Sequence, residues 1–162
     1  NLQLSEKVHN ASCLAGIAFS EASLGICHSL AHGMGGRFHI PHGRANAMLL
    51  PHVIFYNAGL DLTKELPALE KYQQAAHRLG IKGGTPKATV NLLVTGIFRL
   101  AKQLEIPKTI GEYGIDEKEF IAAIPEMAQV AMDDACTPTN PRVPQVTDLE
   151  AIYRKLCRRG EW

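Results

Sequence analysis

The stretch that decides the fold is residues 24–53, which read LGICHSLAHGMGGRFHIPHGRANAMLLPHV. Its first part predicts a helix over residues 24–34 that ends at Gly35-Gly36, because glycine is the usual residue at a left-handed helix stop. A second helix is expected after Pro41-His42-Gly43, and Pro51 inside it predicts a kink or break. Two helices joined by a short turn are therefore the starting point of the fold.

Helical patterns continue on both sides of this stretch. Ser5 is expected to cap a first helix, and an apolar stripe over residues 66–79 ends at Gly80. Thr85-Pro86 is typical of an N-cap followed by a first helical residue, and the stripe that follows ends at Pro107. The first helix has an apolar face made of Val8, Ala11, Ala15 and Ala18. Two capping boxes are expected, one from Asp116 and Glu119 and one from Thr147 and Glu150. Pro125 is expected to restart a helix. No segment alternates like a strand, so the sequence predicts an all-α multi-helix bundle, a single domain over residues 1–162.

Composition excludes several classes of protein. The chain has 162 residues, 46% of them apolar, and a formal net charge of +1. A disordered chain needs low hydrophobicity and a large net charge, and near-neutral charge favours neither nucleic acid nor an anionic membrane surface as a partner. The four cysteines stand without CxxC pairs, which favours a reducing, cytoplasmic location.

The N-terminus carries a further expectation. The chain begins at Asn1 without an initiating methionine and without a signal peptide. We interpret this start as a domain boundary, so that the chain is expected to be a piece of a longer protein.

Histidines are concentrated in the deciding stretch. Five of the seven histidines lie between residues 28 and 52. His28 and His32 are four residues apart, a spacing that places both imidazoles on one helix face. His42 follows the Gly35-Gly36 break and therefore approaches from another direction. Three imidazoles from two elements suit Zn²⁺ or Fe²⁺.

A structural interpretation of the same histidines stays open. An HxxxH pair also occurs by chance, and the only carboxylate near the cluster is Glu21, which shares its face only if one helix continues unbroken to His28. His39 is equally explained as a solvated loop residue, and His52 as a core or capping histidine.

The motif resembles a known family. The pattern GxxHxxxHxxG over residues 25–35 is followed by Pro41-His42-Gly43, by Leu50-Pro51-His52-Val53 and, near the C-terminus, by Asn140-Pro141-Arg142. This arrangement resembles the C-terminal signature of iron-containing (group III) alcohol dehydrogenases. It is most similar to the alcohol dehydrogenase part of bifunctional aldehyde–alcohol dehydrogenases and to bacterial ethanol, propanediol and ethanolamine-pathway enzymes.

The resemblance implies roles for individual residues. His28 and His42 would be metal ligands, for Fe²⁺ or Zn²⁺. His32 would lie beside the nicotinamide of NAD(H) and the substrate, where a neutral imidazole relays the alcohol proton. Phe19 and Cys136 would line the substrate pocket, although they are equally explained as a core residue and a small buried hydrophobe. Arg142 is expected to clamp carbonyls of its own loop.

The resemblance also implies that parts of the enzyme's active site lie outside this chain. The family's dinucleotide-binding domain and its other two metal ligands belong upstream, and no glycine fingerprint after a strand exists here. The expected function is therefore the metal-binding domain of an NAD-dependent alcohol dehydrogenase, a homo-oligomer acting on small alcohols and aldehydes, with this piece inactive alone. Two alternatives remain, namely a self-contained metalloprotein with His28, His32 and His42 as ligands, and a non-catalytic helical interaction module.

Overall fold

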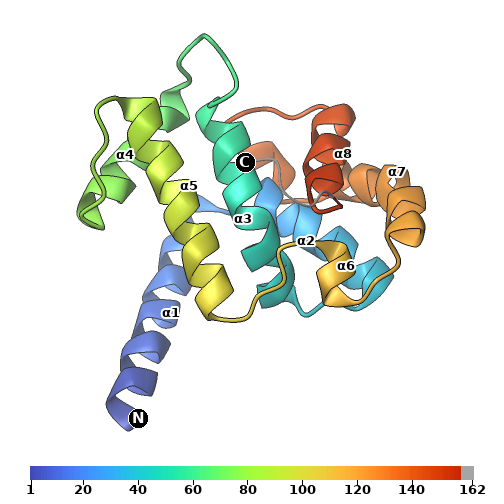
Figure 1. The fold of residues 1–162 in the computed structure, drawn as a ribbon, viewed down its shortest axis with the longest axis horizontal. Coiled ribbons are helices and arrows are strands. Elements are labelled where there is room, and N and C mark those ends of the chain that lie inside the picture. The colour runs from blue at the N-terminus through green and yellow to red at the C-terminus, as the bar shows by residue number, and fades with distance from the viewer. Residues whose placement is uncertain (158–162) are drawn as a thin grey trace.

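The computed structural model describes residues 1–157, and helices account for the regular structure in that range. Leu2–Ala22 forms α1, Ile26–Phe38 forms α2 and His42–Ala58 forms α3 (Figure 1). The remaining elements are α4 (Pro67–Arg78), α5 (Pro86–Gln103), α6 (Ile110–Tyr113), α7 (Glu117–Asp133), the 3₁₀ turn η1 (Thr137–Thr139) and α8 (Val146–Lys155). The prediction of an all-α bundle is confirmed.

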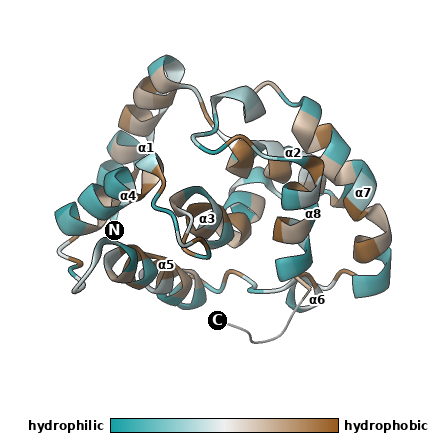
Figure 2. Cartoon of the chain, turned by 90° about the horizontal axis from the view of Figure 1, so that it is seen from above, coloured by the Kyte–Doolittle hydropathy of each residue, from teal (hydrophilic) through white to brown (hydrophobic). Residues whose placement is uncertain are grey.

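Helix α3 is the central element, and both hydrophobic cores form around it. Figure 2 shows α3 in the middle, with α4 and α5 on one side and α2, α7 and α8 on the other. Met48, Leu49 and Val53 enter the larger core, which α2, α7 and α8 complete. Ile54 and Ala58 enter a smaller core with α4 and α5. Because α3 is apolar on both sides, it is the helix that joins the two halves of the bundle.

Helix α1 stands apart from this bundle and buries none of its residues. The predicted first helix is present, but its apolar face is not buried in residues 1–157, and Val8 is 70% exposed. The chain bends by 109° between α1 and α2, at Ser23 with a φ of 62°. No single helix in residues 1–157 has the length and apolar composition needed to cross a membrane; α1 and α2 meet that test only as a bent pair.

Two predicted helix ends lie elsewhere in the structure. Helix α2 does not stop at Gly35-Gly36 but runs to Phe38, and His39 takes the left-handed conformation with a φ of 53°. Its backbone N–H donates to the Gly35 carbonyl at 3.0 Å, which closes the last turn. Helix α1 begins with Asn1 as its N-cap, four residues before Ser5.

Both internal prolines lie inside continuous helices. α3 runs through Pro51, and α7 runs through Pro125 where a restart was expected. A proline removes one backbone hydrogen bond, yet both helices continue, with buried Leu49 and Val53 around Pro51 and buried Ile124 and Met127 around Pro125. The second capping box is also displaced, because Gln145 and Asp148 form it in place of Thr147 and Glu150. The short α6 was not predicted, although Thr109 caps it by accepting from the Glu112 amide.

The expected N-cap of α5 is confirmed. The Thr85 side chain accepts a hydrogen bond from the Ala88 amide, and Pro86 is the first helical residue. The helix ends at Gln103, before Pro107, and α4 ends at Arg78, before Gly80. These boundaries were predictable because capping and proline effects are local.

Gly33 permits the close packing of α2, and its substitution tests that packing. A Cβ at Gly33 would lie 2.6 Å from the Tyr153 Oη, which donates to the Leu30 carbonyl at 2.7 Å. We predict that Gly33→Ala lowers the free energy of unfolding by about 1–3 kcal/mol. Gly36→Ala, in the same helix with no atom within 4 Å, is the control and is expected to be neutral or to gain about 0.5–1 kcal/mol. Urea unfolding followed by circular dichroism measures both, and equal effects would contradict the packing argument.

Candidate functional site

The turn between α2 and α3 brings His28 and His42 together. Nδ1 of His28 lies 3.0 Å from Nε2 of His42. The Asn46 amide, one helical turn after His42, lies 2.9 Å from the same Nε2 and donates to the His42 carbonyl at 3.1 Å. Two imidazoles from separate helices therefore present their nitrogens to one point.

This nitrogen pair fits a divalent metal ion. Two imidazole nitrogens that share one ion at about 2.1 Å each lie roughly 3.0–3.4 Å apart, which includes the observed separation. Ligation also requires a neutral imidazole. The pKa of His28 is lowered by partial burial and by its neighbours His42 and His32, with Asp134 acting in the opposite direction. Both the spacing and the charge state suit a metal ligand.

His32 has a different partner. Its Nδ1 lies 2.7 Å from Oδ2 of Asp134, a residue that comes from the segment after α7. The His32 ring is stacked on that of His42 at a centroid separation of 5.1 Å, and its side chain is 45% exposed. The structure thus supplies a carboxylate beside the cluster that the sequence analysis did not identify.

Asp134 is held by further hydrogen bonds at its other oxygen. Oδ1 accepts from the hydroxyl of buried Ser29 at 3.2 Å and from the Cys136 amide at 2.8 Å. Partial burial acts to raise the pKa of Asp134, but the hydrogen bonds from Cys136 and His32 outweigh it and lower the pKa to about 2. The carboxylate is therefore ionised at neutral pH and fixed in position.

The donor atoms of the three histidines do not form one compact set. Within residues 1–157, one group of three possible ligands has all its donor atoms within 4.8 Å of one another, and it consists of His32, Asp134 and Cys136. This finding weighs against a self-contained site with His28, His32 and His42 as its ligands. Burial and Asp134 raise the pKa of the Cys136 thiol, which disfavours the thiolate that a metal requires.

The two residues expected in a substrate pocket both lie near the histidines. The ring of Phe19, on α1, is 6.5 Å from that of His28 and 44% exposed. Cys136 is half-buried and joins Asp134 through its amide. Phe19 is therefore not a core residue.

Other sequence candidates lie outside the cluster. Glu21 does not share a helix with His28, because the chain bends at Ser23. His39 is exposed and ends α2. His52 is only 1% exposed, with its ring 5.7 Å from that of Phe98, so it belongs to the protein interior.

The loop after α7 is fastened to α2 and α3 by polar side chains. Asn140 and Asn57 form a reciprocal pair of hydrogen bonds at 3.1 and 2.8 Å, and Oδ1 of Asn140 also accepts from the Ile26 amide at 3.3 Å. Arg142 donates to the carbonyl of Tyr56 at 2.8 Å and stacks on its ring. The expectation that Arg142 clamps its own loop is therefore corrected, because its acceptor lies on α3.

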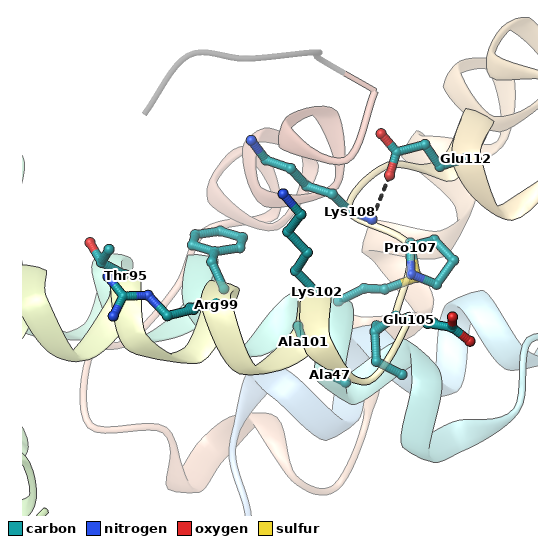
Figure 3. Close-up of a pocket in the computed structure, with 12 residues that line it drawn as sticks. Ala47, Thr95, Arg99, Ala101, Lys102, Glu105, Pro107, Lys108 and Glu112 are labelled. Carbon is teal, nitrogen blue, oxygen red and sulfur yellow. Dashed lines mark hydrogen bonds between the residues drawn. The ribbon is translucent and has the colours of Figure 1, made fainter.

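A cavity of about 800 Å³ lies away from the histidines, between α3, the end of α5 and residues 105–112 (Figure 3). Its lining includes Met48, Phe98 and Lys102, and Oε2 of Glu112 accepts from the Lys108 amide at 2.9 Å. No candidate site residue lines it, so volume alone does not locate the chemistry.

Comparison with known proteins places the chain in a family. The C-terminal region of the Fe-containing alcohol dehydrogenase family matches residues 1–157. The bifunctional aldehyde–alcohol dehydrogenase of Escherichia coli K12 is 41% identical over 157 residues, covering 91% of this chain and 18% of that protein. The NADPH-dependent butanol dehydrogenase of Clostridium saccharobutylicum is 43% identical over 148 residues, covering 91% of this chain and 36% of that protein.

Solved structures agree with the sequence matches. A crystal structure of a 1,3-propanediol oxidoreductase superposes with a TM-score of 0.84 at 35% identity, covering 96% of this chain and 38% of that chain. An iron-containing alcohol dehydrogenase from Thermococcus thioreducens gives a TM-score of 0.82 at 33% identity over 94% of this chain and 37% of that chain. The chain thus spans well under half the length of these relatives.

Buried His52 makes stability depend on pH. Burial, and then Lys155 and Lys108, lower the pKa of His52 to about 3 from 6.5. Between these values the unfolded chain binds a proton that the native ring does not, so stability falls as the pH drops. We predict that His52 lowers the free energy of unfolding by about 2 kcal/mol as the pH falls from 7 to 5.

Urea unfolding at both pH values with a chelator present measures this loss. His52→Gln should make the free energy of unfolding less dependent on pH. His77→Gln, at an exposed position of α4, serves as the control. An unchanged slope in a folded His52→Gln variant would contradict the assignment.

Proposed function

Because the chain belongs to the Fe-containing alcohol dehydrogenase family, we propose that it is the metal-binding helical part of an enzyme that interconverts primary alcohols and aldehydes. The observation that supports this most directly is the 3.0 Å approach of His28 and His42 with His32 stacked beside them. The hydride carrier proposed is a nicotinamide dinucleotide, NAD(H) or NADP(H). Residues 1–157 contain no strand, and hence no glycine-rich strand–turn–helix for its pyrophosphate.

The proposed roles follow the geometry. His28 and His42 hold Fe²⁺ or Zn²⁺. When bound, the metal supplies a Lewis acid that lowers the pKa of the alcohol. His32 accepts the alcohol proton and passes it to water, which suits a half-exposed imidazole. Phe19 and Cys136 contact the substrate from opposite ends of the chain.

Helix α1 is proposed to pack against the part of the enzyme that the relatives carry in addition. Its exposed apolar residues are Leu2, Leu4, Val8, Leu14, Ile17 and Phe19. A set of this size on one helix is typical of a contact surface. More than half of each relative's length lies outside the region that this chain matches. The relatives therefore contain enough additional chain to cover this helix.

Metal binding tests the proposed ligands in the chain itself. We expect His28→Ala and His42→Ala each to weaken Zn²⁺ binding by at least about tenfold, because each removes one of two nitrogens. His32→Ala should bind within about twofold of wild type, and His39→Ala is the matched control from the same turn. Isothermal titration with Zn²⁺ measures all four. Equal losses in His28→Ala and His32→Ala would instead support the three-histidine site.

Turnover tests the reaction. The chain alone should form no NADH from ethanol with Fe²⁺ or Zn²⁺ present, and robust turnover would contradict its role as one part of an enzyme. The active form is tested by joining the chain to the N-terminal portion of the Clostridium butanol dehydrogenase, with butanol and NADP⁺. In this joined protein His32→Gln should lower kcat by about 10²–10⁴ with the metal content unchanged.

A further inference from the structure

Both carboxylate oxygens of Asp134 have hydrogen-bonding partners, three in all. Ser29 and Cys136 both donate to Oδ1, and the His32 ring lies 2.7 Å from Oδ2. An ionised carboxylate can only accept hydrogen bonds. The proton between His32 and Asp134 must therefore be carried by Nδ1 of the ring.

The consequence concerns the other ring nitrogen. A neutral imidazole with its proton on Nδ1 has its lone pair on Nε2. The side chain of His32 is 45% exposed, whereas that of Asp134 is 18% exposed. The nitrogen left for proton exchange is thus the one that Asp134 does not touch.

We infer that Asp134 is a positioning residue that fixes the tautomer and orientation of His32, so that Nε2 is the atom that accepts the substrate proton. This inference rests on the proposed function. In the transfer, the alcohol O–H bond breaks and the Nε2–H bond forms. The resulting imidazolium lies against the Asp134 carboxylate, and loss of the Nε2 proton to water restores the neutral ring.

The support of Asp134 reaches into the core. Ser29 is fully buried, and its hydroxyl lies 2.8 Å from that of Thr137, which donates to the Ala131 carbonyl at 2.6 Å. The carboxylate is therefore held from the side opposite His32 by α2, by the end of α7 and by the following turn. Such a rigid support is what a fixed tautomer requires.

The two donors at Oδ1 make Asp134→Asn an informative variant. Its amide oxygen must face Ser29 and Cys136, so its NH₂ group faces His32 and turns Nδ1 into an acceptor. The proton of the neutral ring then moves to Nε2. Asp133→Asn is the matched control, because Asp133 is exposed and, among residues 1–157, accepts only from Gln129 at 3.1 and 3.0 Å.

The test is ¹⁵N NMR of the histidine rings in the metal-free 162-residue chain at pH 8. We expect His32 to carry its proton on Nδ1 in the wild type and in Asp133→Asn, and on Nε2 in Asp134→Asn. An Nε2-protonated His32 in the wild type would overturn the inference, even if the Asp134 variant does not fold. Zn²⁺ that perturbs His32 and Cys136 before His28 and His42 would also overturn it, in favour of a metal ion at the carboxylate.

Kinetics in the joined protein complete the test. Asp134→Asn should lower kcat by about 10²–10⁴ with KM and metal content near wild type, whereas an unchanged kcat would overturn the positioning role. Failure of the proposed function is recognised separately. In that case His28→Ala and His42→Ala leave Zn²⁺ binding unchanged, whatever the tautomer of His32.

Discussion

The arrangement of the histidines depends on one buried amide, that of Asn140. Helix α2 begins at Ile26. Its N-cap residue, Gly25, has no side chain to cap it, and Oδ1 of Asn140 accepts from the Ile26 amide in its place. A Cβ at Gly25 would lie 2.8 Å from that oxygen, so the glycine is required by the close approach. The same amide pairs with Asn57 near the end of α3. One side chain therefore fixes the C-terminal loop to both helices that carry the histidines.

This constraint explains why residues far apart in the sequence share one small site. His32 and Asp134 are separated by 102 positions, yet Ser29 of α2 donates to Asp134 and is hydrogen-bonded to Thr137. Thr139 separately donates to the Leu24 carbonyl just before α2. Each of these bonds is individually modest, but buried polar networks stabilise one arrangement over its alternatives when every group is satisfied. The rigidity that the proposed proton transfer needs thus comes from the loop, not from the helix that carries the imidazole.

Local signals were sufficient for most helices and insufficient for the site. Thr85-Pro86 marks the start of α5 because capping is decided by neighbouring residues, and the clustering of His28 and His42 is visible in the sequence itself. Asp134 was not predictable, because it belongs to no recognisable motif and its partner His32 is brought to it only by tertiary packing. The exposure of α1 was equally invisible, since an apolar stripe shows that a helix has a face to bury but not where the burying surface lies. The end of α2 was misplaced because two glycines remain helical while His39 takes the left-handed turn.

The pair formed by His28 and His42 has a thermodynamic consequence of its own. Two nitrogens leave most of the coordination sphere of a divalent ion to other ligands. Under the proposed function those ligands come from the rest of the enzyme, so ion affinity and the affinity between the two parts become linked quantities. This linkage is reciprocal. If docking of the two parts raises the affinity for the ion by some factor, the ion raises the affinity between the parts by the same factor. The metal would then link the two parts of the enzyme as well as bind the substrate. Removing it with a chelator would weaken the contact between the parts by the coupling free energy.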